Sequence, residues 1–168
     1  MAGTTWVGEE PGWTVWLKQL DGDERVKYIA GQTGLSIDPF ATRPDEMPTH
    51  LSFLLVVENR SDEQIYFNPM KSWLTTSRTE IKTPIGLNDL QFDYRTTGRK
   101  LPPAYRKAEP TLLTSPMSIP AGEKISGLLV YPMIKPRSKT YTVAVQVTDT
   151  NGDESSFSAP YRLVKTKK

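Results

Sequence analysis

A nearly regular alternation of apolar and polar residues over residues 141–148 is the feature that most constrains how this chain folds. Tyr141, Val143, Val145 and Val147 fall on one side of the run. A period of two residues is typical of a β-strand with one buried face. The dipeptide at 151–152, Asn-Gly, is a strong signal for a two-residue hairpin turn. The C-terminal part of the chain is therefore predicted to form a β-hairpin.

Similar signals recur along most of the chain. Residues 13–20 alternate in the same way, and residues 51–58 are apolar on both sides at their middle, which is typical of a central strand. The Asp-Gly pair at 21–22 indicates a second hairpin turn, so residues 25–30 are expected to return as a strand. Shorter strands are expected over residues 64–68, 72–76, 80–83, 124–131, 155–158 and 161–164.

The prolines and glycines along the chain also indicate the fold class. The 14 prolines and 11 glycines argue against long helices. About eight short strands separated by turns predict an all-β fold, an antiparallel two-sheet sandwich. A chain of 168 residues fits one domain and buries about two thirds of its unfolded surface.

We divide the chain into an N-terminal arm over residues 1–12, a single β-sandwich domain over 13–164 and a basic tail over 165–168. Residues 84–116 contain five prolines and no sustained alternation, so they are expected to form one long loop inserted into the sandwich. Connections of this length inside a compact domain are usually functional or disordered.

Composition excludes several function classes. The formal net charge of +2 is too small to indicate nucleic acid as a partner. Cysteine is absent, which excludes a disulfide scaffold, thiolate catalysis and thiolate metal sites but leaves the compartment open.

Catalytic motifs are missing. His50 is the one histidine, and no Gly-x-Ser-x-Gly motif supplies a nucleophile for it, so we interpret it as a surface residue at a strand edge. The acidic clusters at 9–10 and 21–24 lie in turns, and phosphate-binding glycine loops are absent. We expect no enzyme activity and no cofactor. A copper site is the metal alternative, and its ligands would come from Met47, His50, Met70, Met117 and Met133. Because methionine also fills cores and the spacing is loose, we expect no metal.

The expected insertion at 84–116 is the main candidate for a partner-binding surface. Its stretch from 94 to 107 combines five basic residues with two tyrosines and contains no acid. Tyrosine and arginine are enriched at protein interfaces. Two alternatives remain: the segment contacts nucleic acid or anionic lipid, or it is a solvated loop without a binding role. The candidate residues are Tyr94, Arg95, Arg99, Lys100, Tyr105, Arg106 and Lys107.

Two tryptophans form a second candidate surface. Trp16 falls on the opposite side of its strand from Trp13, so one of this pair should point away from the main core. Trp6 lies in the expected arm. Exposed tryptophans suit either a protein partner or a sugar ring, unless the arm covers them.

Several stretches resemble a bacterial immunoglobulin-like family. They are residues 53–62 and 65–69, then residues 119–123 and 127–132. Members of this family are small extracytoplasmic sandwich domains, often lipoproteins or accessory subunits. The resemblance implies an immunoglobulin-like sandwich that serves adhesion, scaffolding or subunit contact, without a shared catalytic motif.

These observations favour a non-catalytic protein–protein interaction or scaffolding subunit of a larger envelope or membrane-associated complex. Its partners would be proteins, and any membrane contact would be indirect or through a partner. A small-ligand or carbohydrate-binding module is the alternative. The chain start lacks a secretory signal, which fits either a cytoplasmic protein or a mature exported domain in the periplasm or at the cell surface. The resemblance favours the exported setting.

Overall fold

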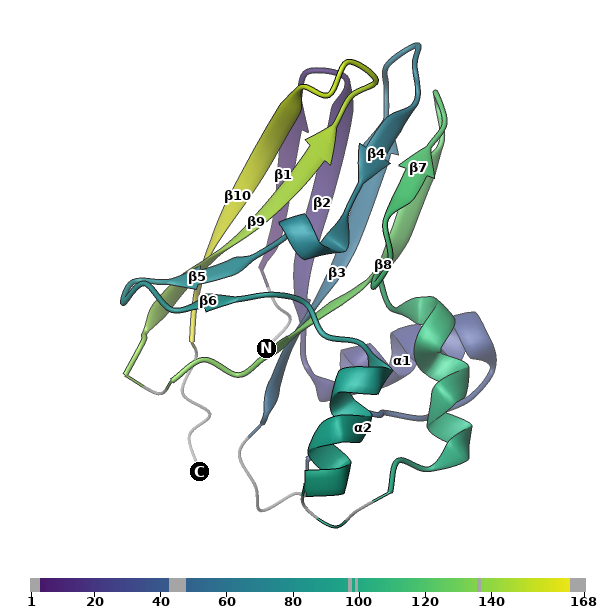
Figure 1. Ribbon diagram of the computed structural model, residues 1–168, viewed down its shortest axis with the longest axis vertical. Helices are drawn as coiled ribbons and strands as arrows, with labels where there is room; N and C mark the ends of the chain where they lie inside the picture. Colours follow the sequence, from purple (N-terminus) through teal and green to yellow (C-terminus); the bar gives the residue numbers. More distant parts are fainter. Residues whose placement is uncertain (1–3, 43–47, 97, 99, 136, 164–168) are drawn as a thin grey trace.

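The computed structural model describes residues 4–42, 48–96, 98, 100–135 and 137–163. Its strands form two sheets, here called sheet A and sheet B (Figure 1). Sheet A has four antiparallel strands in the order β1-β2-β3-β8. Their bounds are Thr5–Glu10 for β1, Trp13–Leu20 for β2, His50–Asn59 for β3 and Lys124–Pro132 for β8.

Sheet B is strongly curled and is built around β9. β10 pairs with one edge of β9, while β4 and β5 pair with opposite ends of its other edge. β6 then extends the sheet from β5, and β7 extends it from β4. A short 3-10 helix, η1 (Pro69–Lys71), connects β4 to β5. The strands are Ile65–Phe67 (β4), Leu74–Thr76 (β5), Ile81–Lys82 (β6), Met117–Ile119 (β7), Thr140–Thr148 (β9) and Glu154–Arg162 (β10).

The inner faces of the two sheets bury a continuous apolar core. Phe53 of β3 has no exposed surface, and its ring lies 5.8 Å from that of Tyr131, 6.3 Å from Tyr141 and 5.0 Å from Tyr161. The Tyr161 hydroxyl crosses between the sheets and donates to the Leu17 carbonyl at 3.0 Å. The burial pattern confirms the alternation predicted for residues 13–20 and 141–148, because the expected inward positions form this core.

Three helical segments cover the other face of sheet A at one end (Figure 1). They are α1 (Gly22–Thr33), α2 (Leu87–Thr96) and the 3-10 helix η2 (Pro103–Thr111). Ile29, Leu90 and Ala108 from these segments form a second apolar cluster with Leu128 and Val130 of β8. The prediction of an all-β, immunoglobulin-like antiparallel two-sheet sandwich with one long loop insertion is therefore wrong. The fold is mixed α/β, with sheet A between sheet B and the helices.

The first helix forms because Asp21 acts as an N-cap and not as part of a hairpin turn. Its carboxylate accepts the Glu24 backbone N–H at 2.8 Å, and the Glu24 carboxylate accepts the Asp21 backbone N–H at 3.1 Å. This reciprocal capping box satisfies two N–H groups that a helix start leaves free. Gly34 ends the helix at φ 75°, a left-handed conformation that favours glycine. Residues 25–30 are therefore helical, and the strand expected there does not exist.

The segment at 84–116 is attached to sheet A near both of its ends. The Ile85 N–H donates to the Val130 carbonyl at 2.8 Å, and the Leu113 N–H donates to the Leu128 carbonyl at 2.9 Å. Residues near both ends of the segment thus provide hydrogen-bond donors for carbonyl groups on the free edge of β8. Pro103 is one of the prolines interpreted above as loop signals, but it starts η2. The first position of a helix tolerates proline because no backbone N–H is needed there.

The N-terminal arm expected over residues 1–12 is instead, over Thr5–Glu10, an edge strand of sheet A. Gly8 lies against the Phe157 ring of β10, where an added Cβ would be 2.2 Å from ring carbons. The basic tail at 165–168 lies outside the described residues. Of the helices that the structure describes, none is long and apolar enough to cross a membrane.

Candidate functional site

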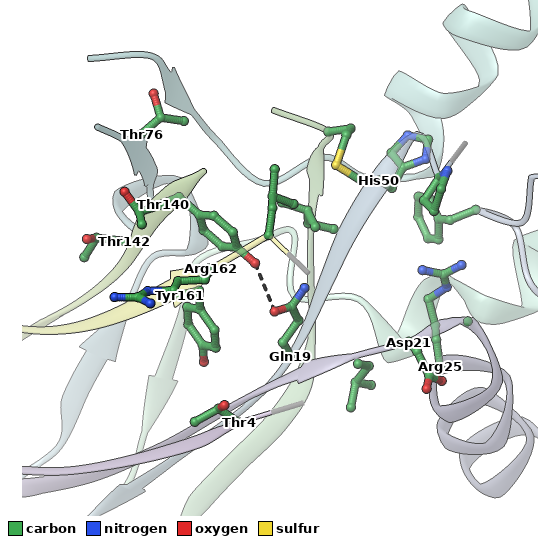
Figure 2. Close-up of a pocket in the computed structure, with 18 of the residues that line it drawn as sticks. Thr4, Gln19, Asp21, Arg25, His50, Thr76, Thr140, Thr142, Tyr161 and Arg162 are labelled. Carbon is green, nitrogen blue, oxygen red and sulfur yellow. Dashed lines mark hydrogen bonds between the residues drawn. The ribbon is translucent and has the colours of Figure 1, made fainter. Parts of the chain in front are cut away.

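A cleft opens between the two sheets, where β1, β3 and β9 begin and β2, β5 and β10 end (Figure 2). Its volume is about 1740 Å3. The start of α1 and the segment at 38–42 close it on the helical side, and threonines of β5 and β9 line the opposite rim. Residues that are far apart in sequence therefore form one elongated hollow.

An aromatic wall lies at the bottom of the cleft. The rings of Tyr141 and Tyr161 stack with centroids 5.6 Å apart, and Trp6 meets Tyr161 edge to face at 6.5 Å. The Tyr141 hydroxyl donates to Gln19 Oε1 at 2.9 Å, shown as the dashed line in Figure 2. Burial raises the pKa of both tyrosines above its usual range, so their hydroxyls stay protonated.

A buried ion pair forms the corner of the cleft beside α1. Arg25 Nε donates to Asp38 Oδ1 at 2.8 Å, and Arg25 Nη2 donates to Asp38 Oδ2 at 2.6 Å. Both side chains are only 8% exposed. Arg25 Nη1 also donates to the Ser52 hydroxyl of β3 at 2.8 Å, and the guanidinium lies 5.9 Å from the centroid of the Phe40 ring. The pair thereby fastens α1 and the 38–42 segment to sheet A.

His50 stands beside this pair and is half-buried, contrary to the expectation of a surface residue. Its ring meets Phe40 edge to face at 5.3 Å, and its Nδ1 lies 2.8 Å from the Thr49 hydroxyl. Burial, and then the positive charge of Arg25, lower the pKa of His50 to about 4, while Asp93 and Asp38 oppose this shift. His50 is therefore neutral near pH 7.

Two observations concern groups in the cleft that could act in catalysis or bind a metal. Among the described residues, the hydrogen-bond partner of His50 is the neighbouring Thr49. Within the described ranges, no three His, Cys, Asp or Glu side chains gather as metal ligands do. Of the copper candidates, Met133 lines the cleft with His50, Met70 lies exposed in η1, Met117 lies in β7, and Met47 lies outside the described residues.

The basic and aromatic residues predicted as a partner surface lie on the helical layer and not in the cleft. Arg95, Lys100 and Lys107 are exposed. Arg106 donates to Gln91 and to Asn88 at 3.5 Å, and so links η2 to α2. Tyr94 and Tyr105 are half-buried, and Arg99 lies outside the described residues. The same helices also carry three exposed acids, which reduce the local positive charge: Asp89, Asp93 and Glu109.

The two candidate tryptophans lie on opposite faces of sheet A. Trp6 packs against the core between the sheets and lines the cleft. Trp16 is half-buried on the outer face, while Trp13 is 2% exposed in the core. The prediction that one of Trp13 and Trp16 points away from the core is confirmed.

Sequence reasoning missed most of the polar residues that line the cleft, including Gln19, Arg25 and Asp38. Gln19 carries one usable signal, because it is a polar residue at an inward position of an otherwise apolar alternation. Arg25 carries another, since it falls four residues before Ile29 on the buried side of α1. Nothing local marks Asp38 as its partner.

Two solved structures are similar to this chain along most of its length. The yjhA protein from Bacillus subtilis has a TM-score of 0.49 and 13% identity, covering 90% of this chain and 93% of that one. A DUF4426 family protein from Pseudomonas aeruginosa PAO1 has a TM-score of 0.42 and 9% identity, covering 95% of this chain and 94% of that one. No family model and no curated protein sequence matches the chain. The comparisons thus give a structural similarity to bacterial proteins and assign no family.

Proposed function

We propose that this protein is a non-catalytic binding module that takes a small organic ligand in the cleft. The observation that carries this proposal is the combination of a hollow of about 1740 Å3, an aromatic wall and polar side chains that converge on it, among them Gln19 and His50. Ligand sites in proteins are typically concave, mostly apolar and furnished with a small number of placed polar side chains.

Three features support the proposal. Trp6, Met133 and Leu163 line the cleft and are only partly buried, so they offer apolar surface to a ligand. The ion pair of Arg25 and Asp38 holds one wall in place, which lowers the cost of ordering the site on binding. The neutral state of His50 keeps that corner free of an additional charge.

The first prediction tests the cleft with a neutral apolar fluorophore, N-phenyl-1-naphthylamine. Met133→Asp is expected to weaken its binding at least tenfold, because a ligand in the cleft would bury a carboxylate without a partner. The matched control is Met70→Asp, since Met70 is 51% exposed in η1 and does not line the cleft, and the affinity of this variant should stay within twofold of wild type. Fluorescence titration measures both. Non-saturable binding by wild type, or equal affinities for all three proteins, would refute the proposal.

A second candidate function is favoured by a separate apolar strip on the outer face of sheet A. Val7 pairs with Trp16 across β1 and β2, and Trp16 pairs with Val56 across β2 and β3. Val7 is 56% exposed. Large apolar side chains of this kind are enriched in the buried centres of interfaces. The strip supports a protein-interaction or scaffolding subunit of a larger envelope or membrane-associated complex, and an extracytoplasmic location is part of this second proposal.

The second prediction concerns this docking role. Val7→Asp should reduce the recovery of native partners after mild solubilisation of membranes at least fivefold, with the thermal midpoint nearly unchanged, because exposed positions usually cost less than about 0.5 kcal/mol. Ile81→Asp is the control, since Ile81 is 65% exposed on sheet B. A separate variant with serine at Arg95, Lys100 and Lys107 tests the helical layer. Undiminished recovery with both test variants would eliminate the docking role.

A further inference from the structure

We infer that the cleft selects ligands that carry an oxygen acceptor, a carboxylate or a carbonyl, on an apolar body, and that Gln19 reads this group through its side-chain N–H. The inference rests on the ligand-binding function proposed above and specifies the chemistry of that site. Gln19 lies on the inner side of β2 and lines the cleft.

Tyr141 fixes which end of the Gln19 amide faces the ligand. Tyr141 is 2% exposed, and its hydroxyl makes one recorded hydrogen bond, to Gln19 Oε1 at 2.9 Å. A buried hydroxyl hydrogen without an acceptor costs about 1–3 kcal/mol, so the oxygen of the amide must face Tyr141. The raised pKa of Tyr141 keeps that hydrogen in place.

The nitrogen of the same amide is left as a donor. Figure 2 shows the dashed line ending at the oxygen of the Gln19 amide. Among the described residues, the hydrogen bond of the Gln19 side chain ends at its oxygen, and its two N–H hydrogens have no protein partner. A ligand oxygen would satisfy this donor, whereas an ammonium group would place donor against donor.

The surroundings of Gln19 define the rest of the ligand. Trp6, Met133 and Leu163 line the same hollow, are partly exposed and offer an apolar surface. The exposed Arg162 lies on its rim, and the described part of the chain provides no ion-pair partner for this cation. An apolar body with a carboxylate or carbonyl therefore matches the walls, the donor and the charge at this end of the cleft.

The third prediction tests this selectivity with two probes that share one chain and differ in their head group. Decanoate should bind wild-type protein at least tenfold more tightly than decylamine, as measured by displacement of N-phenyl-1-naphthylamine. Gln19→Glu keeps an oxygen for the Tyr141 hydroxyl and replaces the donor with an acceptor, so it should reverse the preference. Gln19→Leu removes both groups and should bring the two affinities within threefold of each other.

A further probe and a control variant distinguish the possible ligand classes, and the outcomes show which of the two proposals fails. Acetyl-leucyl-leucinamide presents peptide carbonyls, and tighter binding than decanoate would assign the site to peptide segments and not to fatty acyl chains. Gln146→Glu, on the other side of β9 from the core, should leave the preference unchanged. An unchanged preference in Gln19→Glu, with the fluorophore still bound, would overturn this inference alone. No binding of any probe to wild type would instead refute the ligand-binding function itself.

Discussion

Arg25→Met is expected to lower the free energy of unfolding by about 3–5 kcal/mol, because it leaves the Asp38 carboxylate buried without its cation. The two side chains are 8% exposed and share two hydrogen bonds, at 2.8 and 2.6 Å. Asp38 would retain only its bond from the Phe40 backbone N–H at 3.0 Å. Arg25 also anchors α1 to Ser52 of β3, so its loss removes the link between the helical layer and sheet A at the cleft.

Urea unfolding of three variants checks this expectation. The double variant Arg25→Met with Asp38→Leu should recover most of the lost stability, because neither charge remains in the buried corner. Lys18→Met is the control: its pair with Glu24 is 32% and 22% exposed, and exposed pairs contribute less than about 1 kcal/mol. An Arg25→Met protein as stable as wild type would show that water or a rearranged side chain compensates Asp38, and the corner would not be a rigid wall.

The strands of this fold are readable from sequence because their signal is local. Alternation over 13–20 and 141–148 reports one buried face, and apolar residues on both sides of 51–58 report a strand covered on both faces. The structure gives the second pattern an unexpected cause. β3 is covered by sheet B on one face and, at one end, by helices on the other face.

The helices escaped prediction because two local signals competed. Asp21-Gly22 is a hairpin signal, and Asp21 with Glu24 is also a capping box. Burial decided between them, since a helix places Arg25 and Ile29 together against sheet A. Recognising the Asp-x-x-Glu spacing would have identified α1. In the 84–116 segment, the prolines suggested a loop, but the segment contains two short helices. These helices pack against β8, and the residues that flank them donate hydrogen bonds to the free edge of β8.

The cleft was beyond the reach of sequence patterns because its groups meet only in the folded chain. Gln19 and Tyr141 are separated by 122 positions and touch because β2 and β9 face each other across the core. Local rules describe positions within one element, and they carry no information on which element lies opposite. The described basic and aromatic candidates of residues 94–107 therefore fell on the helical layer, and of the described candidates for partner binding only Trp6 lines the cleft.

Acid is expected to destabilise the protein through His50 over a defined pH range. The pKa of His50 is lowered from 6.5 to about 4 by burial and by Arg25, with Asp93 of α2 and Asp38 opposing. In this pH range His50 is protonated in the unfolded chain but largely neutral in the folded one. The free energy of unfolding therefore falls as the pH drops from 6.5 towards 4. The loss over this range is about 2–3 kcal/mol, since one pKa unit corresponds to about 1.4 kcal/mol and His50 keeps some solvent contact.

His50→Phe isolates this contribution, because the chain has no other histidine and phenylalanine keeps the edge-to-face contact with Phe40. Urea unfolding at pH 7 should give similar stabilities for variant and wild type. At pH 4.5 the variant should be more stable by about 2 kcal/mol, because it has no imidazole to protonate on unfolding. The variant keeps every other side chain of the corner, so contributions that do not involve His50 largely cancel in the difference. Parallel stability curves from pH 7 to pH 4 would contradict the prediction and would mean that water reaches His50 freely in the folded protein.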